Sequence, residues 1–309
     1  MRPEAQIKRP KRPIHGVLLL NKPRGFTSNA VLQAVKRLFQ AEKAGHTGTL
    51  DPLAEGLLPV CLGEATKFSA YQLEADKGYR AQICLGVTTT TGDVEGDVLH
   101  SSPVSVNVSF IDEVMAAFVG EIMQVPPMYS ALKVQGKPLY AYARAGEEIV
   151  RQPRKVHIRS IRVLQFDSPQ LEIEVRCSAG TYIRTLAEDI GIRLGCGGAH
   201  LTGLTRLSSG GFQLEDAVDL AMLETLTLAE RDPLLLPMDV LVAHLPKLDI
   251  DAAGVQALSY GRQFMTTLAT SVTGICRAYD GDKFAGLVER TAEGLAVPRR
   301  LMRHQDSEN

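Results

Sequence analysis

The chain predicts an α+β fold, because strand-like and helix-like segments intermingle along it without the regular alternation of a wound α/β protein. KGYRAQICLG at 77–86 alternates apolar and polar side chains, which is the period of a half-buried strand. Two further alternating segments, at 155–166 and 170–180, lie close together, so part of the sheet is expected to be antiparallel. The next segment, TYIRTLAEDIGIRLG, has helical spacing. We therefore expect a mixed, largely antiparallel sheet flanked by helices and loops.

Upstream of this sheet, strand and helix patterns also follow one another closely. GVLLL at 16–20 predicts a buried strand, and NKPRGFTS continues it as a loop. Ser28 is expected to cap the following helix. The inward positions of that helix are Val31, Leu32, Val35 and Leu38. SFID at 109–112 predicts a second capped helix, so helices and strands alternate irregularly from the start.

The two ends of the chain differ from its centre. Residues 1–13 carry five basic side chains, one acid and three prolines, which is typical of a disordered basic arm. From Asp232 the chain has three prolines in DPLLLPMDVLVAHLP, as in a linker, and short strand-like pieces follow between turns. We expect one catalytic domain at 14–240 and a small, mostly β domain at 246–303.

Composition excludes several classes of protein. The 34 basic and 35 acidic residues rule out an overall polycation, so a nucleic-acid site must come from local clustering. The five cysteines contain no C-x-x-C pair, which argues against a disulfide framework or a cysteine zinc site. No stretch reaches the roughly 18 apolar residues of a membrane span, and no signal peptide is visible. A cytoplasmic protein without metal or membrane association is expected.

GHTGTLDPLAEGLLPV at 45–60 surrounds Asp51 with glycines on one side and a proline on the other. A catalytic carboxylate must be held in one geometry, and glycines permit the sharp turn while Pro52 fixes the direction in which the chain leaves it. The alternative is an Asx turn, in which the carboxylate only binds its own backbone. On this segment alone, both interpretations stand.

Two residues elsewhere favour the catalytic interpretation. Arg184 falls in the first turn of the helix predicted at 181–195, where the helix dipole disfavours a cation, so an anion is expected nearby. An ion pair with Asp51 would keep that carboxylate charged in a closed site. Tyr79 lies on the apolar face of its strand and is either core or a ring that stacks on a base and relays a proton.

Two further features suggest RNA contact. His46 is either a wedge beside a displaced base or a structural residue, and the absence of other ligands at suitable spacing argues against a metal there. The segment 124–155 has six Lys or Arg against two Glu, interleaved with tyrosines. It is either a mobile loop that clamps a phosphate backbone or a solvated insertion.

Five ordered motifs resemble the TruB-type bacterial tRNA pseudouridine-55 synthases: NKPRGFTS, GHTGTLDPLAEGLLPVCLGEATK, KGYRAQICLGVTTTTGDVEG, VPPMYSALKVQGKPLYAYAR and CSAGTYIRTLAEDIG. Their order and spacing agree from about residue 15 to 215. The tail, with FAGLVERTAEGLAVPRRLM, resembles more weakly the PUA-like RNA-binding domain of such enzymes. The resemblance implies a pseudouridine synthase fold and isomerisation of a uridine in the T stem-loop of tRNA, without a cofactor.

The resemblance also assigns roles to residues. It implies that Asp51 is the catalytic aspartate, Arg184 its ion-pair partner and Tyr79 the residue for stacking and proton transfer. His46 is implied to fill the space of the flipped base. The remaining candidate substrate- or RNA-binding residues include Lys22 and Pro23, in a motif that supports the catalytic loop, and Leu204, in the pocket under the uracil. The others are Gly45, Thr47, Tyr182, Lys133 and Arg144, and 124–155 corresponds to a thumb that closes on the RNA. Neither an obligate protein partner nor an oligomer is expected.

Three other functions share some of these sequence features. A guide-RNA-directed synthase of the dyskerin type favours a larger, more basic tail, whereas 246–309 holds eight basic and eight acidic residues. An aspartyl-phosphate enzyme is disfavoured, because its nucleophile precedes T-G-T whereas Asp51 follows it. RNA chaperone activity is compatible with the enzyme, since opening a tRNA to reach a base also assists folding.

Overall fold

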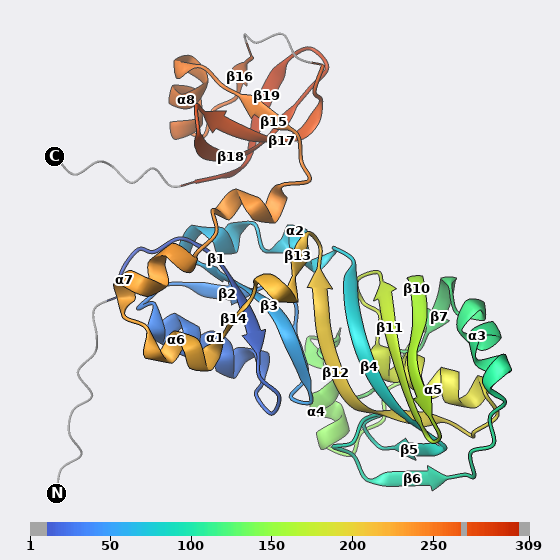
Figure 1. Ribbon diagram of the computed structural model, residues 1–309. Helices are drawn as coiled ribbons and strands as arrows, with labels where there is room; N and C mark the ends of the chain where they lie inside the picture. Colours follow the sequence, from blue (N-terminus) through green and yellow to red (C-terminus); the bar gives the residue numbers. More distant parts are fainter. Residues whose placement is uncertain (1–10, 267–270, 303–309) are drawn as a thin grey trace, which may run out of the picture.

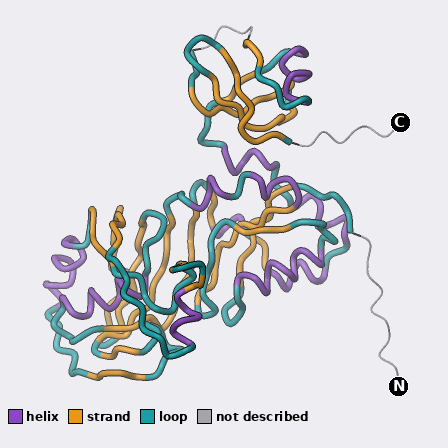
Figure 2. Tube along the Cα trace, turned by 180° about the vertical axis from the view of Figure 1, so that it is seen from behind, coloured by secondary structure: helices purple, strands orange, loops and turns teal. Residues whose placement is uncertain are grey.

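A computed structural model describes residues 11–266 and 271–302 and shows two units (Figure 1). A large unit contains a ten-stranded sheet with helices packed on it, and a small unit contains a five-stranded sheet. Both views place the small unit at one end of the large one, joined by short helical turns (Figures 1 and 2). The predicted α+β class and the mostly β C-terminal unit are confirmed.

The large sheet has the strand order β14-β1-β3-β12-β4-β11-β10-β7, with β2 paired to β3 and β13 to β12. Only the β1–β14 and β3–β12 pairs are parallel among the described strands of this sheet. Its strands are β1 (Gly16–Lys22), β2 (Ala44–His46), β3 (Ala54–Leu62), β4 (Lys77–Leu85), β7 (Gly120–Gln124), β10 (Arg154–Asp167), β11 (Gln170–Cys177), β12 (Ala199–Ser209), β13 (Phe212–Gln213) and β14 (Val218–Asp219). The prediction of a mixed, largely antiparallel sheet is correct.

Two apolar cores lie under this sheet. Helix α1 (Ser28–Leu38) packs with β1 and β3, together with α6 (Leu220–Thr225). Helices α3 (Val108–Ala117) and α5 (Ile183–Arg193) pack on β4, β10 and β11. Leu53 belongs to the second core and Leu58 to the first, so the loop before β3 lies where the two cores meet. That loop carries Asp51.

Both predicted helix caps are shifted by one or two residues. The hydroxyl of Thr27, not Ser28, accepts the N-cap hydrogen bond of α1, from Ala30. The α3 N-cap is Asn107, whose side chain accepts from the Ser109 amide. Ser28 is buried, and its hydroxyl bonds to the backbone of Leu50 instead.

Short elements connect the strands and complete the large unit. They are the helices α2 (Ala70–Leu73), α4 (Leu139–Arg144) and α7 (Leu228–Arg231), the 3-10 turns η1 (Gly63–Lys67), η2 (Leu214–Asp216), η3 (Asp232–Leu234) and η4 (Met238–Val242), and the two-stranded pairs β5 (Val87–Thr89) with β6 (Val98–Ser101) and β8 (Lys133–Val134) with β9 (Lys137–Pro138). The β8–β9 hairpin and α4 fall within 124–155. This segment is therefore not a structureless loop, and Tyr142 is buried on it beneath Lys137.

The small unit packs on the large one through apolar contacts. Its strands are β15 (Lys247–Asp249), β16 (Phe264–Met265), β17 (Gly274–Asp280), β18 (Lys283–Arg290) and β19 (Leu295–Leu301), and its helix is α8 (Ala252–Ser259). The rings of Phe68 and Phe284 lie 5.2 Å apart across the junction, and Leu287 joins the core formed by Val17 and Leu57. The Lys67 ammonium also donates to the Leu301 carbonyl at 2.9 Å.

The start of the described chain is bound rather than free. The Arg12 guanidinium forms an ion pair with Asp232 and donates to the Phe39 carbonyl at 2.9 Å. The expected arm at 1–13 is thus wrong for Arg12, because an acid from the linker region neutralises it. Residues 1–10 of that arm lie outside the described residues.

Candidate active site

The loop that carries Asp51 joins β2 to β3, and hydrogen bonds fix it on both sides of the acid. The Ser28 hydroxyl donates to the Leu50 carbonyl at 2.9 Å and accepts from the Leu50 amide at 2.8 Å. Beyond Asp51, the Gly25 amide donates to the Pro52 carbonyl at 2.8 Å. The loop is therefore held by the NKPRGFTS segment, and the acid points in one direction.

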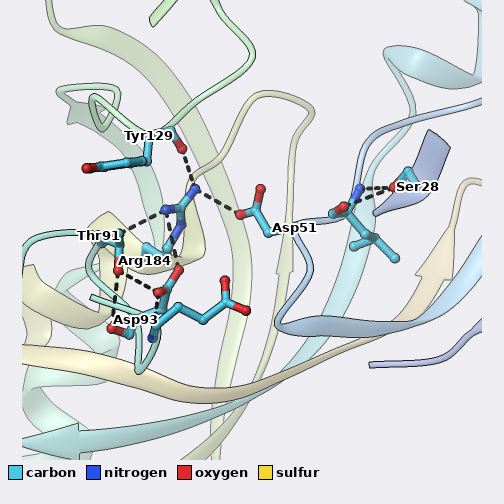
Figure 3. Close-up of polar contacts among 8 residues, drawn as sticks. Ser28, Asp51, Thr91, Asp93, Tyr129 and Arg184 are labelled. Atoms are coloured by element: carbon cyan, nitrogen blue, oxygen red, sulfur yellow. Dashed lines mark hydrogen bonds and ion pairs between the residues drawn. The ribbon is translucent and has the colours of Figure 1, made fainter. Parts of the chain in front are cut away.

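The Asp51 carboxylate binds Arg184, with Oδ2 2.8 Å from Nη2. In the part of the chain that the structure describes, this carboxylate forms no hydrogen bond to an amide of its own loop. The predicted ion pair is present, and the Asx-turn alternative does not hold. Figure 3 shows Asp51 pointing away from Ser28 and toward Arg184.

Arg184 lies in the first turn of α5, and four acceptors surround its guanidinium (Figure 3). Nη1 donates to the Thr91 carbonyl at 2.8 Å and lies 3.4 Å from Oδ2 of Asp93. Nη2 donates to the Tyr129 carbonyl at 2.6 Å, in addition to its contact with Asp51. Two carboxylates thus compensate one buried cation that the helix dipole disfavours.

The charge state of Asp51 reflects opposing effects. Burial raises the pKa of the Asp51 carboxyl above its ordinary value, whereas the Arg184 charge lowers it. The neighbouring Asp93 adds to the rise, and Lys22 opposes it. As expected, the charge of Arg184 lowers the pKa of Asp51 and so favours the ionised form. The effect of burial is larger, so the pKa of Asp51 is raised overall.

Asp93 is a site residue that the sequence did not single out. It is 2% exposed and accepts hydrogen bonds from the Thr91 hydroxyl at 2.6 Å and the Glu95 amide at 3.1 Å. Gly92 has φ +73°, and a Cβ there would lie 3.3 Å from the Cβ of Arg184. The signal was an acid directly after a glycine that must adopt a left-handed conformation, within TTTTGDVEG.

Asp51 lies on the wall between two cavities. The smaller, about 250 Å³, is also lined by Tyr79, Leu204, Arg206 and Arg184. The larger, about 530 Å³, is also lined by His46, Asp93, Glu95, Tyr140, Arg144 and Arg184. The smaller cavity is below the roughly 300–1,000 Å³ typical of pockets for drug-sized ligands, so it suits a single ring. The carboxylate can therefore act on the junction between a ring in one cavity and a group in the other.

Comparison with known proteins identifies the family. Residues 36–183 match the N-terminal domain model of the TruB family pseudouridylate synthases, and residues 184–243 match the C-terminal domain model of tRNA pseudouridylate synthase B. The chain is 54% identical to tRNA pseudouridine synthase B of Methylobacillus flagellatus and 56% identical to that of Thiobacillus denitrificans. Each match covers 96% of this chain and 98% of the relative. The chain belongs to the TruB family.

Solved structures agree with this membership. A Cbf5–Nop10–Gar1 complex contains a chain with TM-score 0.71 and 29% identity, covering 93% of this chain and 85% of that one. An H/ACA ribonucleoprotein bound to a substrate RNA gives TM-score 0.70 and 26% identity, covering 94% and 86%. The boundary between the two TruB family models falls at α5, ahead of the central strand β12, so the large sheet is built from both.

Of the three TruB-type candidates on β2 and just after it, one faces a cavity. His46 lines the larger cavity, and its Nδ1 accepts from the Gly48 amide at 3.4 Å. Burial, with the nearby Arg206 charge, lowers the pKa of His46, which favours the neutral ring. Gly45 pairs with β3, and Thr47 is fully buried, so neither lines a described cavity.

Lys22 and Pro23 support the loop that carries Asp51 and line neither cavity. Lys22 is fully buried, and its ammonium donates to the Pro23 carbonyl at 3.0 Å and the Phe26 carbonyl at 2.6 Å. Burial lowers the pKa of Lys22 to about 8, while Asp51 opposes that shift. These bonds fold the turn whose Gly25 amide holds the loop after Asp51.

Three of the other four predicted RNA-contacting residues line one of the two cavities, and the fourth lines neither. Tyr182 and Leu204 line the smaller cavity, and Arg144 lines the larger one. Tyr182 is fixed by Gln124, which exchanges hydrogen bonds of 3.0 and 3.3 Å with its backbone. Lys133 is exposed on β8 and lines neither cavity.

Arg206 is the second site residue that the sequence missed. It is 1% exposed, pairs with Tyr79 across the sheet and lines the smaller cavity together with it. Strand β12 has irregular register between Leu201 and Gly203 and again between Arg206 and Ser208. Simple alternation therefore does not show on which side of the sheet an arginine at this position lies.

Residues 11–266 and 271–302 contain no group of three or more His, Cys, Asp or Glu side chains placed to hold a metal ion. No helix within those ranges is both long and apolar enough to cross a membrane.

Proposed function

We propose that the protein converts uridine 55 in the T stem-loop of tRNA to pseudouridine, with Asp51 as the catalytic carboxylate. The observation that carries this proposal is the Asp51–Arg184 pair at 2.8 Å on the wall of a ring-sized cavity. Membership of the TruB family and relatives named tRNA pseudouridine synthase B support the choice of reaction and substrate.

The reaction needs no atom from outside the substrate. The N1–C1′ bond breaks, the uracil turns, and a C5–C1′ bond forms. C5 then loses a proton, and N1 gains one. Attack of Asp51 at C1′, its addition at C6 and its removal of a ribose proton on a glycal route all require the ionised carboxylate. Arg184 favours that form and holds it in place.

The two cavities divide the nucleotide. We place the uracil ring in the smaller cavity, between Tyr79 and Leu204, and the ribose beside Asp51 at the mouth of the larger one. A stacked base must leave the RNA loop to reach this position, at a cost of a few kcal/mol. His46 lines the larger cavity, where it takes the space of the displaced base, and Arg144 meets a phosphate there.

The small unit is proposed to be a PUA-like domain that extends the RNA-binding surface. We further propose that the protein acts as a cytoplasmic monomer without an obligate protein partner. The solved neighbours are titled as complexes with Nop10 and Gar1 or as an H/ACA ribonucleoprotein, but they are 26–29% identical, against 54–56% for the tRNA-named relatives. The higher identity favours a free tRNA substrate over a guide RNA.

The test is pseudouridine formation on an in-vitro-transcribed tRNA, with RNA binding measured in parallel. Wild type is expected to modify the T-loop uridine, and Asp51→Asn to bind the tRNA without modifying it. A tRNA with cytidine at position 55 is the substrate control. Absence of modification by folded wild type contradicts the proposed reaction. Full turnover by Asp51→Asn contradicts the role of the aspartate, and improved tRNA folding without turnover indicates a chaperone.

A further inference from the structure

Arg206 occupies the centre of the large sheet. Its backbone pairs with Tyr79 of β4 on one side and with Gly56 of β3 on the other. Its guanidinium donates from Nε to the Leu57 carbonyl at 2.6 Å and from Nη2 to the Gly48 carbonyl at 3.4 Å. Through its backbone and its side chain, Arg206 thus connects strands β3, β12 and β4 to the loop that precedes Asp51.

This cation lacks the compensation that Arg184 receives. Throughout the described ranges, no carboxylate lies within ion-pair distance of Arg206, whereas Arg184 has two. A buried charge without a counter-charge is costly, so its retention calls for a reason other than stability. Tyr79 is its cross-strand partner and lines the same cavity, and the charge of the guanidinium acts on this phenol.

The field of Arg206 acts on the hydroxyl that faces the smaller cavity. Burial raises the pKa of Tyr79, and the Arg206 charge opposes this rise. The other titratable groups that act on this phenol are Cys177 and Asp51, and both raise its pKa further. Arg206 is therefore the group that favours proton acceptance by Tyr79.

We propose that Arg206 is a positioning residue for Tyr79: its guanidinium holds the phenol hydroxyl at the cavity and fastens the Gly48 turn to β12. This inference rests on the proposed function. The Tyr79 hydroxyl gives its proton to N1, and the phenolate that results takes the proton from C5, so the enzyme is unchanged at the end. Arg206 favours the phenolate, which is the form of Tyr79 that accepts the proton.

A second buried arginine provides a matched comparison. Arg231 is 8% exposed, donates to the Leu223 and Leu38 carbonyls at 2.8 and 2.7 Å, and lines neither cavity. It shares the burial and the carbonyl acceptors of Arg206 but has no phenol beside it. Arg231→Met is therefore the control for loss of a buried arginine as such.

The experiment compares Arg206→Met with Arg231→Met and wild type in the full-length protein. With 3-fluorotyrosine at position 79, fluorine NMR without RNA measures the phenol pKa. Single-turnover rates and tRNA affinity are measured on the unlabelled proteins. Arg206→Met is expected to raise the phenol pKa and to lower the rate by about 10²-fold, the lower end of typical proton-transfer contributions, with tRNA affinity nearly unchanged. Arg231→Met is expected to change none of these.

An unchanged phenol pKa in Arg206→Met overturns the pairing, and a raised pKa with an unchanged rate overturns its part in the reaction. If Arg206→Met does not fold, Arg206→Lys is used in its place. Lysine keeps the positive charge but lacks the planar guanidinium and its several N–H donors. An intermediate pKa and rate support the proposal, and wild-type values for both overturn it. If wild type itself modifies no tRNA, the proposed function fails, while the pKa measurement still reports on the pair.

Discussion

Asp93→Asn tests whether the buried carboxylate behind Arg184 organises the site. Asparagine has nearly the same shape and retains an oxygen to accept from Thr91 and Glu95, so the change removes mainly the charge. A hydrogen bond to a charged group contributes about 1.5–3 kcal/mol, and breaking a buried ion pair costs about 3–5 kcal/mol. Because Arg184 still forms its ion pair with Asp51 in this variant, we expect the smaller of these losses of stability, about 1.5–3 kcal/mol.

At roughly 2–4 °C per kcal/mol for a domain of this size, that loss lowers Tm by about 3–12 °C in a thermal scan. Single-turnover pseudouridine formation is expected to fall by about 10²-fold, because Arg184 loses one of its two anchors and no longer fixes Asp51. Asp97→Asn is the matched control, since Asp97 is exposed in the same turn. If Asp93→Asn keeps the wild-type Tm and rate, the 3.4 Å contact between Arg184 and Asp93 contributes nothing, and the network argument is refuted.

Three further predictions concern the loop of Asp51. Because the folded-state pKa of Asp51 is raised, ionising it opposes folding as pH rises through that pKa. Asp51→Asn is therefore expected to match or exceed the wild-type Tm at pH 7, with the difference vanishing in acid; a clearly lower Tm at pH 7 contradicts this. The wild-type single-turnover rate should fall in acid with a midpoint above the ordinary aspartate pKa of about 3.9, and a midpoint at or below it argues against the burial effect. Ser28→Ala, which leaves the Leu50 amide and carbonyl unpaired, should cost about 1–3 kcal/mol and lower turnover more than RNA affinity, whereas exposed Ser109→Ala should do neither.

The part of the site that the sequence predicts is the part in which the local environment of one residue requires a partner from elsewhere in the chain. A cation in the first turn of a helix needs an anion, and the ion pair between Arg184 and Asp51 is present. Asp93 and Arg206 were not predicted, because the position of each depends on tertiary structure. Asp93 follows a left-handed turn at Gly92 that packs against Arg184 of α5, and Arg206 lies in a stretch of β12 with irregular register. Alternation alone cannot follow a strand through such irregularities.

The helix cap illustrates the same limit on a smaller scale. Thr27 and Ser28 are both good N-cap residues, and local sequence does not rank them. The choice is made by the loop of Asp51, which uses the Ser28 hydroxyl for the Leu50 amide and carbonyl and leaves Thr27 to cap α1. A residue expected to start a helix thus holds the loop of Asp51 in place.

The two arginines give the site a polarity that suits the proposed reaction. Asp51, Asp93 and Glu95 line the larger cavity, where their three negative charges exceed the two positive charges of Arg184 and Arg144. The smaller cavity is lined by Arg206 and Lys77 in addition to the Asp51–Arg184 pair, and Arg206 forms no ion pair with a carboxylate among the described residues.

Breaking the N1–C1′ bond leaves electron density on the uracil and positive charge on the ribose. With the base in the smaller cavity and the ribose beside Asp51, each developing charge meets fixed groups of opposite sign. The reversed placement would set a developing anion beside the carboxylates of the larger cavity. Electrostatics therefore favours the same orientation of the nucleotide as cavity size does, which supports the role proposed for Arg206.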